Sequence, residues 1–127
     1  MEINDVDLSL KVFNHFTSGT KHHLTNDVSD IAPDVKQYIM DFVFGKIYAR
    51  SGLEDQEKAI VTIVTLMSIG GCEHELNTHI NTALNVGVSP KKIVDVFIQA
   101  LPYAGFPRVI NAISVAKVVF KEKNVNI

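Results

Sequence analysis

The fold of the second half of this chain is decided at Gly70-Gly71-Cys72-Glu73-His74-Glu75-Leu76-Asn77-Thr78-His79. Two successive glycines end a preceding helix, because glycine costs entropy inside a helix and adopts positive φ without strain. Glu73 and Glu75 follow at once, and the helix dipole favours negative charge in the first turn of a helix. The segment therefore predicts the end of one helix, a turn, and a second helix over about 72–85.

This second helix places a thiol, a carboxylate and an imidazole on one edge. At about 100° per residue, Cys72, Glu75 and His79 fall within an arc of about 60°. The apolar residues beside them are Leu76, Ile80 and Ala83, and the polar residues mostly opposite are Asn77, Thr78, Asn81 and Asn85. The three residues therefore border the apolar face, which is where an acid/base pair that lines a pocket would lie.

Each of these side chains has a functional and a structural interpretation. Cys72 is either a nucleophile, whose thiol pKa the helix N-terminus lowers against the repulsion of the neighbouring acids, or a buried inert cysteine. His79 is either a general acid/base or a histidine at the core edge that is hydrogen-bonded to a neighbour. Glu75 precedes His79 by one turn and supplies a carboxylate that would orient the imidazole.

The histidines do not form a metal site. His74 lies about 200° around the helix from Cys72, so that Cys72, His74 and His79 do not converge as zinc ligands must. His22 and His23 are adjacent, and adjacent helical residues do not face each other, so a solvated surface is expected there.

Composition narrows the class of protein. The chain has 127 residues, of which 46% are apolar, enough for a single domain over 1–127 with its own core. The net charge of −2 without a basic stripe argues against nucleic acid or an anionic membrane surface as a partner. One cysteine cannot form an internal disulfide, the N-terminus lacks a signal-peptide pattern, and the longest apolar run is too short to span a bilayer. We therefore expect a cytoplasmic protein.

Helical periodicity recurs along the whole chain. Helices are predicted over 6–16, from Pro33 to about 50, over 54–69, 72–85 and 90–101, and over 109–121, with a weaker one over 21–30. No strand period persists anywhere, so the predicted fold is an all-α bundle of about six to seven helices. Gly45 inside the second helix indicates a close helix contact or a kink.

The segment 59–69 is rich in β-branched residues, which would suit a buried strand. Its length and the acidic start over 54–57 favour a helix instead. This helix is apolar nearly all round, and so is the final helix. A 127-residue monomer cannot cover both, so we expect a homo-oligomer whose interface includes them.

A tight corner is predicted at Tyr103-Ala104-Gly105-Phe106-Pro107, after Pro102 kinks or ends the preceding helix. Tyr103 either lines a pocket or packs with its hydroxyl at the rim. Arg108 either clamps a substrate carboxylate or forms a surface ion pair. With Phe106, these two residues are the candidates for substrate binding.

Residues from about Asp30 to Phe120 resemble the carboxymuconolactone decarboxylase family. The residues that carry the resemblance are Ala32-Pro33-Asp34, Phe42, Gly45, Tyr48, Gly70-Gly71-Cys72, Glu75-Leu76, His79, Ala83 to Ser89, Ile93 to Val96, Gln99, Tyr103 to Pro107 and Asn111-Ala112. The resemblance implies an all-helical protein without a cofactor that assembles into rings, often hexamers. A trimer of dimers is the assembly that we expect.

The resemblance also implies two chemistries. True members decarboxylate a small carboxylated muconolactone, and a sister group resembles alkylhydroperoxidase D, a thiol peroxidase. That group uses Cys-x-x-Cys, a histidine and an upstream glutamate. Cys72 matches the first cysteine and His79 the histidine, whereas Glu75 replaces the second cysteine and Ala59-Ile60 stand near the upstream acid.

Three functions follow from these residues. The first is a lyase in which His79, oriented by Glu75, donates a proton to carbon after CO₂ is lost. The second is a peroxidase or redox sensor with one cysteine, in which Cys72 forms a sulfenic acid that an external thiol resolves. The third is a non-catalytic oligomeric binding protein, which the missing upstream glutamate favours.

Overall fold

The computed structural model describes residues 5–17 and 28–127, and these residues form helices and turns without a strand. The elements are α1 (Asp5–Thr17), α2 (Pro33–Tyr38), the π-helix η1 (Ile39–Ile47), α3 (Asp55–Ile69), α4 (Glu73–Asn85), α5 (Pro90–Gln99), α6 (Leu101–Ala104) and α7 (Phe106–Glu122). The predicted all-α fold is confirmed. Of the weak helix expected over 21–30, only 28–30 are described and they form a turn, while His22 and His23 lie outside the described residues.

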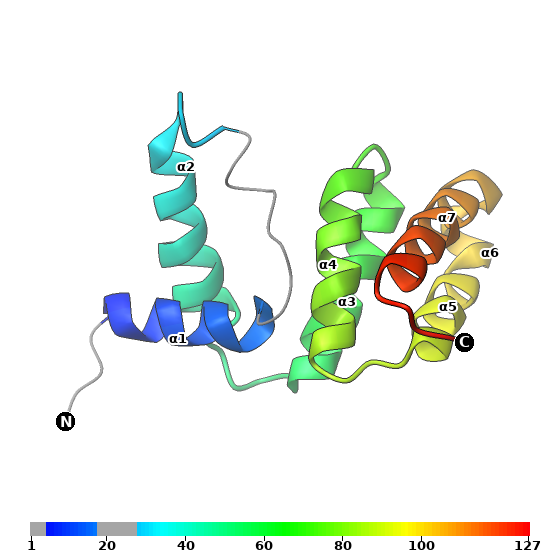
Figure 1. The fold of residues 1–127 in the computed structure, drawn as a ribbon, viewed down its shortest axis with the longest axis horizontal. Helices are drawn as coiled ribbons and strands as arrows, with labels where there is room; N and C mark the ends of the chain where they lie inside the picture. The colour runs from blue at the N-terminus through cyan, green and yellow to red at the C-terminus, as the bar shows by residue number, and fades with distance from the viewer. Residues whose placement is uncertain (1–4, 18–27) are drawn as a thin grey trace.

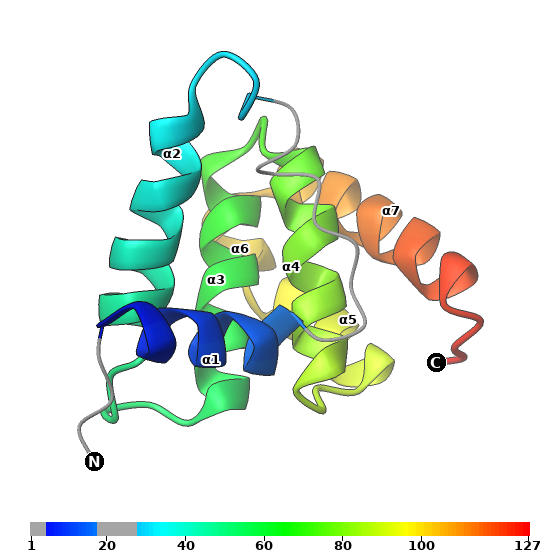
Figure 2. The ribbon, with the colours of Figure 1, turned by 60° about the vertical axis from the view of Figure 1, so that its left-hand side comes forward.

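The helices form two packed groups, which Figures 1 and 2 show from two sides. Helices α3 to α7 make a bundle in which α4 packs against both α3 and α7. The largest side chains that the bundle buries completely are Ile63, Ile80, Ile93, Phe97, Val88 and Val119. Helix α1 crosses η1 and also contacts α4.

Helices α1, α2 and η1 form the smaller group, which has its own aromatic core. Phe16 from α1 packs edge-on against Tyr48, with ring centroids 4.8 Å apart, and Phe13 packs against Phe44 at 5.0 Å. A Cβ atom added to Gly45 would lie 3.2 Å from the Cβ of Ser9. The close helix contact predicted at Gly45 is therefore confirmed, and its partner is α1.

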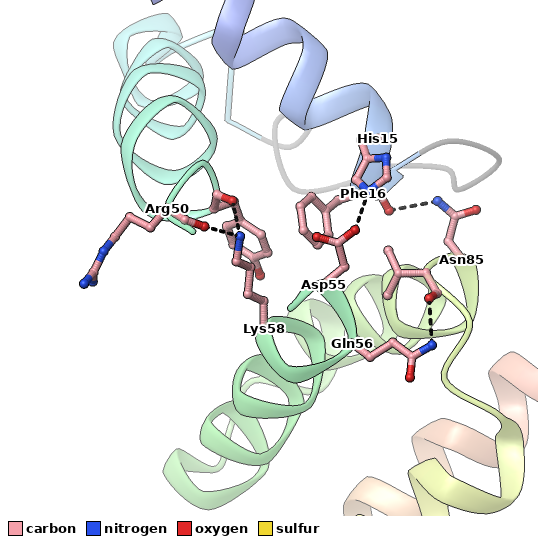
Figure 3. A network of polar contacts seen from close by, with 9 residues as sticks. His15, Phe16, Arg50, Asp55, Gln56, Lys58 and Asn85 are labelled. Atoms are coloured by element: carbon pink, nitrogen blue, oxygen red, sulfur yellow. Dashed lines mark hydrogen bonds and ion pairs between the residues drawn. The ribbon is translucent and has the colours of Figure 1, made fainter. Parts of the chain in front are cut away.

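Polar contacts join the two groups at the start of α3 and the end of α4 (Figure 3). His15 of α1 lies 2.6 Å from the carboxylate of Asp55 at the start of α3. The side-chain amide of Asn85 donates to the carbonyl of Phe16 at 2.9 Å. These bonds attach the end of α1 to both helices of the central pair.

Helix α3 confirms the prediction of a helix rather than a strand over 59–69. The backbone N–H of Glu54 donates to the carboxylate of Glu57 at 2.8 Å, which stabilises its first turn. Only one side of α3, Ala59, Ile63 and Met67, is fully buried. In the described part of one chain, α3 is therefore not buried on most sides as expected, because no described element covers its outer face.

The predicted corner is shorter than expected, which is a correction. The chain turns only at Gly105, with φ of 93°, and α7 begins at Phe106 rather than at Val109. Pro107 suits the first turn of a helix, because that turn leaves backbone N–H groups without helical partners in any case. Helix α5 ends at Gln99, and Pro102 lies in the first turn of the short helix α6 rather than in the last turn of α5. No helix in the described ranges is long and apolar enough to cross a membrane.

Candidate functional site

The turn between α3 and α4 has the backbone that the sequence predicts. Gly70 and Gly71 have φ of 77° and 72°, a conformation that residues with a Cβ rarely adopt. Helix α4 begins at Glu73, and Cys72 is its N-cap residue. The Cys72 thiol donates a weak hydrogen bond to the Gly70 carbonyl, with Sγ and O 3.5 Å apart. This bond therefore keeps the Cys72 thiol close to the glycine turn that precedes α4.

Arg108 lies against this turn. A Cβ atom at Gly70 would be 1.9 Å from Nη1 of Arg108 and 2.9 Å from Cζ, whereas a Cβ at Gly71 would have no neighbour within 4 Å. Glycine at position 70 thus leaves the space that the guanidinium occupies. Arg108 stands in the first turn of α7, so this contact connects the start of α7 to the start of α4.

Cys72 and Arg108 line one small pocket together with Asn111. Its volume is about 40 Å³. A water molecule occupies about 30 Å³ in the liquid, so this pocket has room for about one water and is too small for an organic substrate. This pocket can therefore admit a larger molecule only if the turn or Arg108 moves.

Arg108 also lines a larger groove of about 610 Å³. Ile60 and Val64 of α3 form part of its apolar wall, and Ser68, Gln99 and Tyr103 add polar atoms. This size and this mixture of walls are usual for small-molecule sites. Among the described residues Arg108 forms no ion pair, so the surface ion pair considered from the sequence is not found.

Cys72, Glu75 and His79 are all half-buried, as expected for the edge of the apolar face. Glu75 and His79, however, line neither the small pocket nor the groove. Within the described part of the chain, Glu75 makes no hydrogen bond or ion pair with His79. The structure thus groups Cys72 with Arg108, and leaves the roles assigned to Glu75 and His79 as predictions.

The environment of His79 differs from the expected polar flank. Thr78 is buried rather than exposed, and its hydroxyl donates to the His74 carbonyl at 3.4 Å. Thr82 is buried in the same way, one turn later. A hydroxyl satisfied by the preceding turn can be buried at little cost, so threonine does not mark the exposed side of α4. The Nδ1 atom of His79 is itself shielded from solvent.

The two aromatic candidates are separated by the turn at Gly105. Tyr103 is 89% exposed and lines the groove, and Phe106 is exposed and lines neither cavity. Three further polar residues were not singled out as site residues: Ser68, Gln99 and Asn111. The sequence marks Ser68 only as a polar residue in a mainly apolar run. Its position near Gln99 follows from the packing of α3 against α5, which the sequence pattern does not show.

In the ranges 5–17 and 28–127, no three His, Cys, Asp or Glu side chains gather in a way that could hold a metal ion. The groups that line the groove are instead one guanidinium, an amide and two hydroxyls. Such groups can bind and orient a negatively charged oxygen through hydrogen bonds. The arrangement therefore suits recognition of a small oxygen-rich anion.

Comparison with known proteins gives consistent matches over most of the chain. The model of the carboxymuconolactone decarboxylase family matches residues 33–118. A 4-carboxymuconolactone decarboxylase of Acinetobacter baylyi is 30% identical over 106 residues, which cover 82% of this chain and 78% of that protein. An uncharacterized 15.0 kDa protein in the nqo9-nqo10 intergenic region of Paracoccus denitrificans is 23% identical over 110 residues, covering 86% and 82% of the two chains. The matched region contains the glycine turn, α4, the groove and Arg108, and the chain belongs to the carboxymuconolactone decarboxylase family.

Proposed function

We propose that this protein is a carboxy-lyase that removes CO₂ from a small carboxylated lactone or a related acid without a cofactor. Family membership and the named activity of the Acinetobacter relative support the reaction class. The observation that carries the proposal is Arg108, whose guanidinium lies against Gly70, lines a groove of about 610 Å³ and has no ion pair among the described residues.

The reaction needs two things from the protein. When the C–C bond to the carboxylate breaks, its electron pair moves through the conjugated C=C bond to the lactone carbonyl oxygen, which becomes an oxyanion. A proton must then be added to carbon to complete the product. The protein therefore has to stabilise the developing oxyanion and hold a proton donor near the ring.

Arg108 is the proposed anion-binding residue. Pairing it with the carboxylate that departs would stabilise the substrate more than the transition state and would slow the reaction. We therefore assign Arg108 to an oxygen that keeps or gains charge, either a second carboxylate of the substrate or the lactone carbonyl. Tyr103 forms the wall of the groove beside it, and Phe106 is proposed to cover the substrate at the adjacent turn.

His79 is the proposed proton donor, with Glu75 as the carboxylate that orients it. Its support is the family pattern and the half-buried position of both side chains on one edge of α4. Histidine titrates near neutral pH, so it can give up a proton and regain it from water. Because neither residue lines the groove with Arg108, the assignment has to be tested separately from the reaction class.

The test is CO₂ release by the purified protein from carboxymuconolactone and related lactones. We expect turnover, a roughly 10²–10⁴-fold lower kcat in His79→Gln, and little change in His74→Gln, an exposed histidine on the same helix. An unchanged kcat in His79→Gln would remove His79 as the donor and leave the reaction class standing. No turnover at high enzyme concentration would overturn the substrate assignment itself.

A thiol-dependent peroxidase is the second candidate, because Cys72 stands at the N-cap position of α4 and shares a pocket with Arg108. A helix N-terminus and a nearby guanidinium both favour a thiolate. The thiolate would attack the O–O bond of a peroxide, giving a sulfenic acid and an alcohol. An external thiol would then displace water to form a mixed disulfide, and a second thiol would restore Cys72.

This candidate is tested by titrating Cys72 with a thiol-reactive probe across pH, using Cys72→Ser as the blank. A thiolate poised for peroxide reduction is expected to react with an apparent pKa well below the free-thiol value of about 8.5. An apparent pKa at or above that value argues against the peroxidase. A protein with neither activity would be the non-catalytic binding protein.

A further inference from the structure

A second hollow lies between the end of η1, the loop over 48–54 and the first turns of α3. Its volume is about 370 Å³, which is within the usual range for small-molecule sites. No residue that lines it also lines the groove beside Arg108. It is therefore a separate feature of the fold, and the proposed lyase reaction makes no use of it.

The walls of this hollow are apolar side chains that one chain leaves uncovered. Ile47, Leu53 and Val61 line it, and each is about half exposed. Apolar groups grouped around a concave surface gain free energy when a ligand removes them from water. The hollow therefore favours an apolar ligand body.

The floor of the hollow contains a directed chain of hydrogen bonds. The Thr62 hydroxyl donates its single proton to the Lys58 carbonyl at 2.9 Å. The 2.7 Å bond between Tyr48 and Thr62 must therefore have Tyr48 as its donor. Burial raises the pKa of Tyr48, against a smaller lowering by its bond to Thr62, so that it stays protonated at neutral pH. Neither hydroxyl has a proton left to offer a ligand.

The donors available to a ligand are thus the cations. The Lys58 ammonium donates to the carbonyls of Tyr48, at 2.8 Å, and of Arg50, at 2.5 Å, and these bonds use two of its three protons. Figure 3 shows the ammonium pointing at these carbonyls, while the Arg50 side chain extends away from it. One positive charge is therefore held in place by hydrogen bonds, and the other is on an exposed side chain.

These two charges have no carboxylate partner in the hollow. No carboxylate lines the hollow, and in the described part of the chain neither Lys58 nor Arg50 forms an ion pair. Two cations beside apolar walls complement a ligand with an apolar body and one negative group. An uncharged apolar ligand would leave this potential unused.

We propose that this hollow binds a small apolar monocarboxylate, with the carboxylate at Lys58 and Arg50 and the hydrocarbon against Ile47, Leu53 and Val61. The third proton of Lys58 is its fixed donor, and Arg50 closes over the second oxygen. The proposal does not depend on the lyase reaction, because the two cavities share no residue.

The test is titration of the full-length protein with octanoate, followed by backbone amide NMR, with octanol as the uncharged control. We expect saturable shifts confined to about 47–62 and affinity for octanoate at least tenfold above that for octanol. Arg50→Gln should weaken octanoate three- to tenfold and leave octanol unchanged. Equal binding of acid and alcohol would overturn the anion site.

A pair of matched variants checks the location. Val61→Phe fills the hollow and should weaken octanoate binding at least tenfold. Val118→Phe on α7 is the control and should not weaken it, because Val118 is 50% exposed, close to the 54% of Val61, but does not line the hollow. Shifts at Ser68 and Gln99 instead would assign the acid to the other groove and overturn the proposal. The proposal would also be overturned if light scattering showed that Val61→Phe loses a bound second copy of the chain, and if neither the wild type nor the variant bound octanoate.

Discussion

Gly70 and Gly71 both have positive φ, 77° and 72°, but have different neighbours. Residues with a Cβ rarely adopt such φ, so alanine at either position should cost about 1–3 kcal/mol in the free energy of unfolding. Gly70→Ala should cost more than Gly71→Ala, because only its Cβ would meet the guanidinium of Arg108, at 1.9 Å. Urea unfolding of both variants measures the difference.

The same pair reports on the proposed reaction. The added Cβ in Gly70→Ala should displace Arg108. This variant should therefore have a higher KM or a lower kcat than Gly71→Ala. Equal unfolding free energies and equal kinetics in the two variants would show that the contact between Gly70 and Arg108 contributes nothing.

Tyr48 predicts a dependence of stability on alkaline pH. Burial raises its pKa in the folded protein above the unfolded value of about 10. Its contribution is therefore complete below pH 10 and is lost as the pH rises through the folded pKa, by at most about 1.4 kcal/mol per pH unit. Urea unfolding between pH 8 and 11 should show this fall.

Two phenylalanine variants isolate the effect. Tyr48→Phe should lose about 1 kcal/mol at pH 8, because the bond to Thr62 is gone, and should fall less steeply above pH 10. Tyr103→Phe is the control, since its side chain is 89% exposed and should keep the wild-type slope. Parallel pH curves for wild type and Tyr48→Phe would contradict the assignment.

At the scale of elements, Phe16 is the most buried aromatic side chain that attaches α1 to the rest of the molecule. Phe16 is 2% exposed and packs edge-on against Tyr48, below the Lys58 ammonium at 5.9 Å from the ring centroid. Phe16→Ala should lower the free energy of unfolding by about 3–5 kcal/mol. Leu10→Ala on the same helix is the control, because Leu10 is 50% exposed and should cost much less.

Circular dichroism during urea unfolding measures this difference. If α1 were held mainly by its surface bonds, such as His15 to Asp55, the two variants would be similar. That ion pair is solvent-exposed and should contribute no more than about 1 kcal/mol. The aromatic contact is therefore expected to dominate.

At the scale of the whole molecule, many large apolar side chains remain exposed in one chain. The outer faces of α3, α6 and α7 expose Ile69, Tyr103, Phe106, Ile110 and Val118. Monomers rarely leave so much apolar surface in water. We propose that these faces form the interface of a homo-oligomer, with a trimer of dimers as the assembly.

Light scattering at micromolar concentration tests this proposal. The wild-type protein should have a mass that is a multiple of 14.1 kDa. Val64→Asp should dissociate it, because a charge at this half-buried position on the edge of the groove would be desolvated without a partner. A clean monomer that persists on dilution would show that these helices need no partner.

Local chemistry in the sequence was sufficient to predict most of the helices. The period of apolar residues, the double glycine before Cys72, and Ser89 with Pro90 each define a helix boundary within a few residues. The predicted start of the last helix was wrong, because a proline can either end or begin a helix. Pro107 was assigned to the corner before this helix, whereas it lies in the first turn of α7, which begins at Phe106. These signals are local because capping and backbone strain act between residues that are close in the chain.

The site depended on contacts between distant segments. The sequence determined that Cys72, Glu75 and His79 share one edge of α4, since helix geometry fixes their spacing. Only the tertiary structure decided that Arg108, 36 positions after Cys72, occupies the space beside Gly70, and that His79 lies outside both cavities lined by Arg108. The packing of α4 against α7 makes that choice, because the crossing of two helices depends on all the side chains between them rather than on any local pattern.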